Sequence, residues 1–234
     1  MTFRKVGIIG AMVEEIELLH KHAQVSGSRT KAGITYYEGT LHGMPVVFCK
    51  SGVGKVNAAV CTQLLIDQGV DSVLFTGVAG ALDPELEVGD IVISTNCVQH
   101  DMDVTPLGFP RGVIPFQDLT EFTADERLVA LAEQAAETHF AGRYRKGTVL
   151  SGDQFIASRE AVKTLREELN GSCAEMEGAA LAQVCAMNGV PYVVIRSMSD
   201  KADGGAPESF AEFTVKAADN SYLIIEDMIK RMVG

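Results

Sequence analysis

Short runs of aliphatic and β-branched residues alternate with longer stretches of helical periodicity along nearly the whole chain. The runs fall at residues 5–9, 46–50, 73–76, 91–94, 148–151 and 192–196. Apolar residues recur at helical spacing in residues 13–23, 56–68, 124–138, 159–169, 178–188 and 210–232. Such alternation is typical of α/β proteins. It predicts a mixed, largely parallel β-sheet with helices packed around it.

The length of the chain fits one domain. Its 234 residues can bury a single core, and a hydrophobic content of 47% argues against disorder. We find no internal repeat and no low-complexity linker, so we expect one domain over residues 1–234. Residues 34–41 and 44–50, joined by His42-Gly43, indicate a hairpin at one end of the sheet. Residues 100–117 contain three prolines and two glycines, which indicates a long loop that is functional or contacts a partner.

Charge and cysteine usage narrow the class of protein. The 20 basic and 31 acidic residues give a net charge of −11, which argues against nucleic acid or an anionic membrane as the main partner. Five scattered cysteines without CxxC spacing favour buried thiols in a reducing compartment. The first apolar run is too short for a signal peptide, and no segment is long enough to span a bilayer. We therefore expect a soluble cytoplasmic protein.

Three carboxylates lie near the ends of predicted strands. Glu175 and Glu177 are two residues apart, so their side chains point the same way if that stretch is extended. Asp200 lies just past the apolar run of residues 192–195. Carboxylates just beyond strand ends in α/β proteins lie where ligands bind. A cluster of acceptors without metal-ligand histidines suits a substrate rich in hydroxyls and ring nitrogens, such as a ribonucleoside.

Two other positions leave a structural and a functional reading open. Glu15 lies beside the apolar face of the first predicted helix, where it either stabilises the helix dipole or has a function. Phe155 lies just beyond a predicted strand end, where its ring either packs in the core or stacks on a flat base. His100-Asp-Met-Asp103 lacks the further ligands of a zinc site. We therefore predict no metal site and no cofactor.

Eight short motifs occur in one order along the chain. They are Val6-Gly-Ile-Ile-Gly-Ala-Met-x-Glu-Glu, Lys50-Ser-Gly-Val-Gly-Lys-Val-Asn-Ala-Ala, Thr76-Gly-x-Ala-Gly, Val88-Gly-Asp-Ile-Val, His100-Asp-x-Asp-Val-Thr, Val149-Leu-Ser-Gly-Asp-x-Phe-Ile, Glu175-Met-Glu-Gly-Ala-Ala and Arg196-x-x-Ser-Asp. Each is modest alone, but the ordered set is specific. The chain closely resembles the 5′-methylthioadenosine/S-adenosylhomocysteine nucleosidases of the purine nucleoside phosphorylase superfamily, from about residue 5 to about residue 230.

The resemblance implies a fold and a reaction. The implied fold is a three-layer α/β/α arrangement around a central mixed sheet, assembled as a homodimer. The implied reaction is irreversible hydrolysis of the N-glycosidic bond of 5′-methylthioadenosine, S-adenosylhomocysteine and 5′-deoxyadenosine, which releases adenine. Such an enzyme serves methionine salvage and the recycling of S-adenosylmethionine by-products. The chemistry is consistent, because a departing neutral purine needs a proton at N7 and the cationic sugar is stabilised by nearby carboxylates.

The resemblance also implies roles for individual residues. Glu15 matches the general base that activates water, and Asp200, held by Ser199, matches the acid that protonates adenine N7. Glu175 and Arg196 match residues that help hold the water. The matching substrate contacts are Phe155 and Ile156 for the base, Met176 and Glu177 for the ribose, Met12, Val53 and Phe210 for the ribose and 5′ region, and Leu107 and Pro115 from the partner subunit.

Two positions depart from the family pattern, and three alternative functions are considered. Val78 stands where many relatives have a serine near the water, and Leu107 where many have an aromatic in the 5′ pocket. A phosphorolytic enzyme of the same fold must bind a dianion, whereas this chain has Glu15 after its first glycine turn and no arginine between Lys5 and Arg29. An aminodeoxyfutalosine nucleosidase could share the same adenine and ribose contacts. A non-catalytic nucleoside-binding module would not need both Glu15 and Asp200.

Overall fold

The computed structural model describes residues 3–233, and eleven strands in this range form one continuous sheet. Neighbouring strands follow the order β2-β3-β4-β1-β5-β11-β6-β10-β9-β7-β8. Their bounds are β1 Val6–Gly10, β2 Gln24–Lys31, β3 Ile34–Leu41, β4 Met44–Lys50, β5 Ser72–Phe75, β6 Val78–Ala81, β7 Ile91–Gln99, β8 Glu121–Thr123, β9 Tyr144–Ser151, β10 Gly171–Glu175 and β11 Tyr192–Asp200.

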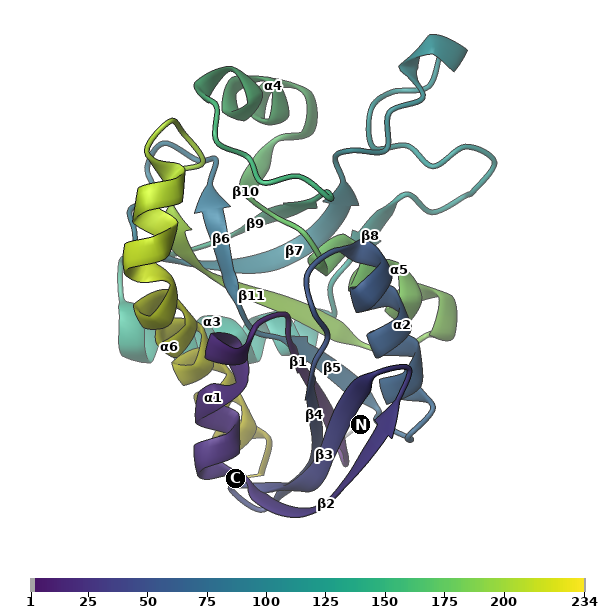
Figure 1. Cartoon of the computed structure of the whole chain (residues 1–234), viewed down its shortest axis with the longest axis vertical. Coiled ribbons are helices and arrows are strands. Elements are labelled where there is room, and N and C mark those ends of the chain that lie inside the picture. Colours follow the sequence, from purple (N-terminus) through teal and green to yellow (C-terminus); the bar gives the residue numbers. More distant parts are fainter. Residues whose placement is uncertain (1–2, 234) are drawn as a thin grey trace.

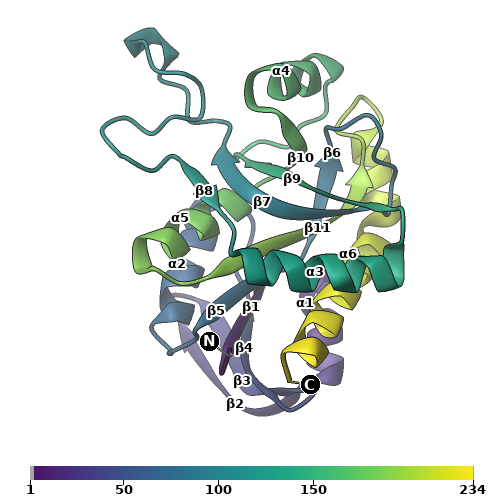
Figure 2. The same cartoon turned by 180° about the vertical axis from the view of Figure 1, so that it is seen from behind.

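Helices cover the sheet on both sides (Figures 1 and 2). Their bounds are α1 Val13–His22, α2 Lys55–Ile66, α3 Glu126–Phe140, α4 Arg159–Leu169, α5 Gly178–Asn188 and α6 Ala206–Val233, with a short 3₁₀ turn, η1, at Thr105–Leu107. Helix α6 packs on β11 with α1 and α3 beside it, whereas α2 and α5 pair on the other side of the sheet. This arrangement confirms the predicted three-layer fold.

Strand β11 joins two halves of the sheet. Its first residues pair in parallel with β5, from Tyr192 to Val194. Its next residues pair antiparallel with β7, and its last residues pair in parallel with β6. Because β7 also pairs with β9, the strands β11, β6, β10, β9 and β7 form a closed ring. The carboxyl end of β11 therefore lies among the ends of several strands, which is a favourable place for a binding site.

The strands and helices predicted from periodicity are all present, with ends shifted by a few residues. The predicted hairpin is confirmed, since β3 and β4 pair antiparallel from Leu41–Met44 onward. Helix termini carry the expected signals. Ser158 and Asp125 cap α4 and α3 with their side chains, and Asn170 and Gly189 end α4 and α5 in the left-handed conformation.

Four strands were not predicted: β2, β6, β8 and β10. Strand β2 is exposed along its whole length and carries no alternation of apolar and polar residues. It also has a register shift between Val25 and Gly27. Strands β6 and β10 are built from small residues, Val-Ala-Gly-Ala and Gly-Ser-Cys-Ala-Glu, and β8 has only three residues. Within residues 3–233, no helix has the length and continuous hydrophobicity of a membrane span.

The structure places two of the carboxylates differently from a simple extended strand followed by a loop. Asp200 is the last residue of β11, not a residue beyond the strand, because the strand continues through Ser197–Asp200 along β6. Glu177 does not continue the extended conformation of Glu175. It has φ −136° and ψ −39° and begins α5. The two glutamates therefore make separate contacts.

Candidate active site

A cavity of about 330 Å³ lies at the ends of β1, β9, β10 and β11. It gathers residues from motifs that are far apart in the sequence. Four buried carboxylates line it: Glu15 at the start of α1, Glu175 at the end of β10, Glu177 just before α5 and Asp200 at the end of β11. Its predicted members are Met12, Glu15, Val53, Val78, Phe155, Ile156, Glu175, Met176, Glu177, Ser199, Asp200 and Phe210.

Glu15 is buried at the first turn of α1 and is held by three backbone donors. The N–H groups of Ala11, Met12 and Val78 donate to its carboxylate at 2.5, 2.9 and 3.1 Å. Burial raises the pKa of Glu15 above its usual value, while the charge of Arg196 and these three donors oppose that rise. The two sequence readings therefore coexist: Glu15 caps its own helix and also lines the cavity.

Asp200 is also buried, but its surroundings differ. Ser199 Oγ donates to one carboxylate oxygen and the Ala202 N–H to the other, both at 2.8 Å. Burial raises the pKa of Asp200, and the nearby Asp203 carboxylate adds to the rise. Glu15 has three hydrogen-bond donors and faces the guanidinium of Arg196. Within residues 3–233, Asp200 has two donors and no facing guanidinium. Burial thus raises the pKa of both carboxyl groups, and a neighbouring cation opposes the rise only at Glu15.

The strand β6 sets the spacing between these two carboxylates. A Cβ on Gly77 would lie 2.6 Å from Glu15 Oε1, and one on Gly80 would lie 2.7 Å from Asp200 Oδ1. Glycine at both positions thus lets each carboxylate approach the backbone closely. Three residues of extended chain span roughly 10 Å. The two carboxylates therefore approach the backbone at two separate points along the cavity wall.

Glu177 is the third buried carboxylate. The Gly54 N–H donates to its Oε1 at 2.7 Å, which ties the β4–α2 loop to the start of α5. Burial and the neighbouring charge of Glu175 raise the pKa of Glu177 to about 8. A buried carboxylate with so few donors is suited to accept hydrogen bonds from ligand hydroxyls.

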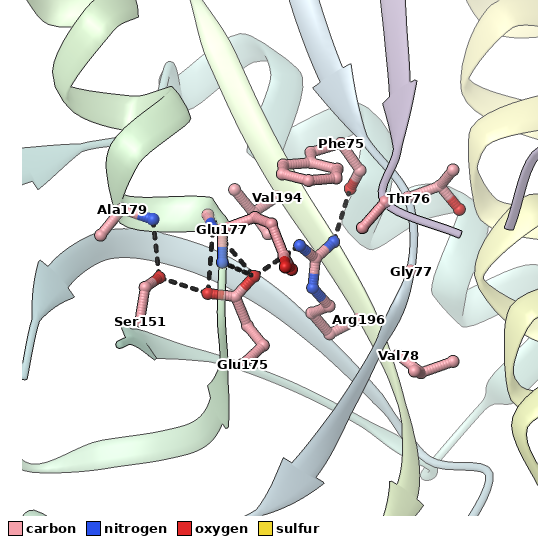
Figure 3. A network of polar contacts seen from close by, with 12 residues as sticks. Phe75, Thr76, Gly77, Val78, Ser151, Glu175, Glu177, Ala179, Val194 and Arg196 are labelled. Atoms are coloured by element: carbon pink, nitrogen blue, oxygen red, sulfur yellow. Dashed lines mark hydrogen bonds and ion pairs between the residues drawn. The ribbon is translucent and has the colours of Figure 1, made fainter. Parts of the chain in front are cut away.

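Glu175, which lines the cavity, forms a buried ion pair with Arg196 (Figure 3). Arg196 Nη2 lies 2.6 Å from Glu175 Oε2, and its guanidinium lies 4.2 Å from the centroid of the Phe75 ring. Glu175 also accepts from the Gly178 N–H at 2.9 and 2.8 Å and from Ser151 Oγ. Its carboxylate therefore holds the first turn of α5 in place. Arg196 is buried behind the cavity and is not among its lining residues.

The apolar part of the cavity is formed around two phenylalanines. The rings of Phe155 and Phe210 meet edge to face, with centroids 5.6 Å apart. Phe155 is 49% exposed, so it is not a core residue and its ring is available to a ligand. Ala11, Ala79, Gly80, Gln154 and Ala174 also line the cavity. We did not select them from the sequence, although the Thr76-Gly-x-Ala-Gly motif contains Ala79 and Gly80.

Leu107 and Pro115 do not line the cavity of their own chain. They lie on the segment between β7 and β8, which projects from the body of the molecule in Figures 1 and 2. Leu107 is 72% exposed. Neither residue contributes to the site within one chain.

Comparison with known proteins gives one family. The chain matches the phosphorylase superfamily over residues 5–230. It is 43% identical over 231 residues to the 5′-methylthioadenosine/S-adenosylhomocysteine nucleosidase of Chromohalobacter salexigens, with 98% of each chain covered. It is 44% identical over 229 residues to that of Marinomonas sp., covering 96% of this chain and 98% of the relative.

Solved structures agree with the sequence matches. The nucleosidase of Neisseria meningitidis in complex with methylthio-immucillin-A has a TM-score of 0.93 at 40% identity, with 97% of this chain and 99% of that chain covered. The futalosine hydrolase of Helicobacter pylori has a TM-score of 0.92 at 36% identity, with 98% of both chains covered. From the family match and from identities above 40% along nearly whole chains, this protein belongs to the 5′-methylthioadenosine/S-adenosylhomocysteine nucleosidase family of the phosphorylase superfamily.

Proposed function

We propose that this protein hydrolyses the N-glycosidic bond of 5′-methylthioadenosine and S-adenosylhomocysteine, and also of 5′-deoxyadenosine, with release of adenine. The observation that carries the proposal is the pair of buried carboxylates, Glu15 and Asp200, that line one cavity from α1 and β11. The membership of this protein in the nucleosidase family supports the same activity. Such an enzyme acts in methionine salvage, and its five buried free cysteines suit a reducing cytoplasm.

In the proposed reaction, water attacks C1′ of the ribose as the bond from C1′ to adenine N9 breaks. Glu15 accepts a proton from the water. Asp200 gives its proton to N7, so that adenine leaves as a neutral base. Glu177 accepts from the ribose hydroxyls, and Phe155 stacks on the base beside the backbone of Ile156. Positive charge on the sugar is stabilised by the surrounding carboxylates.

Water is favoured over phosphate as the nucleophile. Phosphate would need cations at the water position, but the carboxylate of Glu15 lies there. The nearest guanidinium, that of Arg196, is already paired with Glu175 and stacked on Phe75. With wild-type protein, substrate and phosphate, we expect free 5′-substituted ribose. Formation of the sugar 1-phosphate would identify a phosphorylase instead.

An aminodeoxyfutalosine nucleosidase is the second candidate. The match to a futalosine hydrolase, at 36% identity, is nearly as good as that to the nucleosidases. The two activities differ only in the 5′ substituent. An adenine-release assay with 5′-methylthioadenosine, S-adenosylhomocysteine, 5′-deoxyadenosine and aminodeoxyfutalosine ranks them directly. A clear preference for aminodeoxyfutalosine would replace our assignment.

The role of Glu15 is tested by Glu15→Gln. The amide keeps the size of the side chain but cannot accept the water proton, so we expect adenine release to fall by about 10²–10⁴-fold. Binding of a non-hydrolysable adenine nucleoside should persist. Asp200→Asn is the companion variant. Its loss of activity should be smaller for substrates with better leaving groups, because these need less help from an acid. Near-normal turnover by Glu15→Gln would remove Glu15 from the reaction.

The proposal includes a homodimer in which the loop between β7 and β8 completes the neighbouring site. Phe116 on this loop is 96% exposed, and Leu107 is 72% exposed. Val53 at the cavity and Val56 on α2 are also exposed. Strongly exposed apolar side chains are typical of a protein–protein interface. Leu107 and Pro115 would then meet the 5′ substituent in the partner's cavity.

A further inference from the structure

Ser221 on α6 has a fully buried hydroxyl with three hydrogen bonds. Its oxygen accepts from Thr76 Oγ1 at 2.8 Å and from the Gly77 N–H at 3.0 Å, and it donates to the Ile195 carbonyl at 3.2 Å. A serine hydroxyl has one donor and two acceptor positions. All three are used here, so this side chain links α6 to the chain between β5 and β6 and to β11.

The segment that Ser221 holds leads directly to Glu15. Gly77 lies between β5 and β6, and Thr76, Gly77 and Val78 run past Arg196 in Figure 3. The Gly77 carbonyl accepts from the Ser197 N–H at 3.0 Å. The N–H of the same peptide unit, that of Val78, donates to Glu15 Oε1 at 3.1 Å. Because a peptide unit is planar, the direction of that N–H depends on how both sides of Gly77 are held.

We infer that Ser221 is a positioning residue for Glu15: by holding the Gly77 N–H and Thr76, it aims the Val78 N–H at the carboxylate. Gly77 has no Cβ to restrict it, and a Cβ there would meet Glu15 Oε1. The glycine that allows the close approach is therefore conformationally free unless another group fixes it. Ser221 supplies that constraint from a helix that is remote in the sequence. The inference rests on the proposed role of Glu15 as the base.

Loss of the Ser221 hydroxyl has a predictable electrostatic effect. The Val78 N–H is one of three backbone donors that favour the ionised form of Glu15, together with the facing charge of Arg196 from β11. Glu177 and Glu175 are the other charged groups in this cluster, and Arg196 is near both. If the Val78 N–H turns away, the carboxylate loses a donor and its pKa rises. A base with a higher pKa needs a higher pH to act.

The test is the pH dependence of kcat/KM for Ser221→Ala. We expect the midpoint of the acid limb to move up by about 0.5–1 pH unit, which corresponds to a loss of about 3–10-fold one unit below the wild-type midpoint. The loss should shrink on the alkaline side of that limb, and KM should change less than kcat. Ser221→Cys keeps nearly the same shape but is a poorer acceptor, so it should shift the limb in the same direction and replaces the alanine variant if that variant does not fold.

Ser72→Ala is the matched control. Ser72 is a fully buried serine at the start of β5, and its Oγ has no hydrogen-bond partner within the described residues. The Ser72→Ala variant should leave the acid limb of the kcat/KM profile at the pH of the wild type. If the limb of each folded Ser221 variant coincides with that of the wild type while only the melting temperature falls, Ser221 is structural and the inference is wrong. If the wild type releases no adenine from any nucleoside, the proposed function itself fails.

Discussion

Four buried carboxylates line one cavity. Glu175 is paired with Arg196, and the donors of the other three separate their roles. Glu15 has three backbone N–H groups and a facing guanidinium, Asp200 has one hydroxyl and one N–H, and Glu177 has the Gly54 N–H. Glu177 is consequently the least compensated of them, with a pKa near 8 in the protein without ligand. A group that is poorly satisfied without ligand gains most when hydroxyls arrive.

Because Glu177 is buried and has, among the described residues, only the Gly54 N–H as a donor, we predict that Glu177→Gln stabilises the protein and weakens substrate binding. The folded pKa of about 8 lies above the ordinary value of 4.5. The contribution of Glu177 to stability is therefore complete below about pH 4.5 and is lost as the pH rises to 8. At pH 8 the variant should melt higher than the wild type, with each kcal/mol worth about 2–4 °C. The difference should shrink towards pH 5.

An exposed glutamate supplies the control for this measurement. Glu212→Gln, on the exposed side of α6, should leave the melting temperature nearly unchanged at both pH values. A Glu177→Gln variant that melts lower than the wild type at pH 8 would show that Glu177 is already well satisfied in the free protein.

At the residue scale, the sequence predicts which side chains meet, but not what holds them. The motifs bring Glu15, Asp200, Glu177 and Phe155 to one cavity, and the structure agrees. The donors from Gly54 and Val78 could not be predicted, because they depend on how loops from separate strands face one another. The pairing of Arg196 with Glu175 likewise requires knowing that β10 and β11 approach from either side of β6.

Three loops at the cavity are fastened to one another at the N-terminus of α2. Asp153, after β9, accepts from the Lys55 N–H at 2.8 Å, and its own N–H donates to Asp101 at 3.0 Å. Lys55 Nζ lies 2.6 Å from Asp101 Oδ1. Burial opposes ionisation of Asp101, but the hydrogen bonds from Lys55 and the Asp153 N–H hold its pKa below the usual value. Gly54, which precedes Lys55, donates to Glu177.

Lys55→Met should therefore weaken substrate binding from outside the cavity. Methionine keeps the apolar stem but leaves the largely buried Asp101 without its cation, which costs about 1–3 kcal/mol. Loosening of the α2 terminus should displace the Gly54 N–H from Glu177. We expect KM to rise about tenfold, equivalent to about 1.4 kcal/mol, with the acid limb of the pH profile unchanged. Steady-state kinetics over a pH series measures both quantities.

The control for this variant is Lys163→Met on α4. Lys163 forms only a long, exposed pair with Glu167, at 3.8 Å. It should alter neither KM nor stability. If Lys55→Met behaves in the same way, the fastening of the three loops has no influence on the ribose contact.

At the element scale, the sequence predicts those strands and helices whose side chains are buried either on one face or on all sides. Strands such as β1 and β5 are continuous apolar runs, and α1 and α3 have a distinct apolar face. Strand β2 was missed because its outward and inward residues are equally exposed. Strand β6 was missed because glycine and alanine, needed for close approach of Glu15 and Asp200, carry almost no strand signal.

At the scale of the whole molecule, one projecting loop carries two strongly exposed apolar side chains. The loop between β7 and β8 carries Leu107 and Phe116, while the net charge of the chain is −11. Leu107→Asp should weaken self-association and the binding of apolar 5′ substituents, because it places a carboxylate in an apolar contact. Unsubstituted adenosine should be affected less. Sedimentation velocity and kinetics with 5′-methylthioadenosine and adenosine measure these effects.

Val25→Asp on β2 is the matched control for the loop variant. Val25 is also an exposed apolar residue, at 45%, but it lies on the edge strand at the other end of the sheet order. It should leave both the sedimentation coefficient and the substrate preference unchanged. A fully active wild-type monomer at micromolar concentration would contradict the shared site.

The edge strand β2 has features that disfavour pairing with a strand of another copy. An unpaired strand edge can add the strand of another copy, and repeated addition produces filaments. Here the register shift between Val25 and Gly27 distorts that edge, and Arg29 and Lys31 place cations along it. The β2 end of the sheet is therefore a poor template for another strand. Repeated strand-by-strand addition of copies at this end is disfavoured.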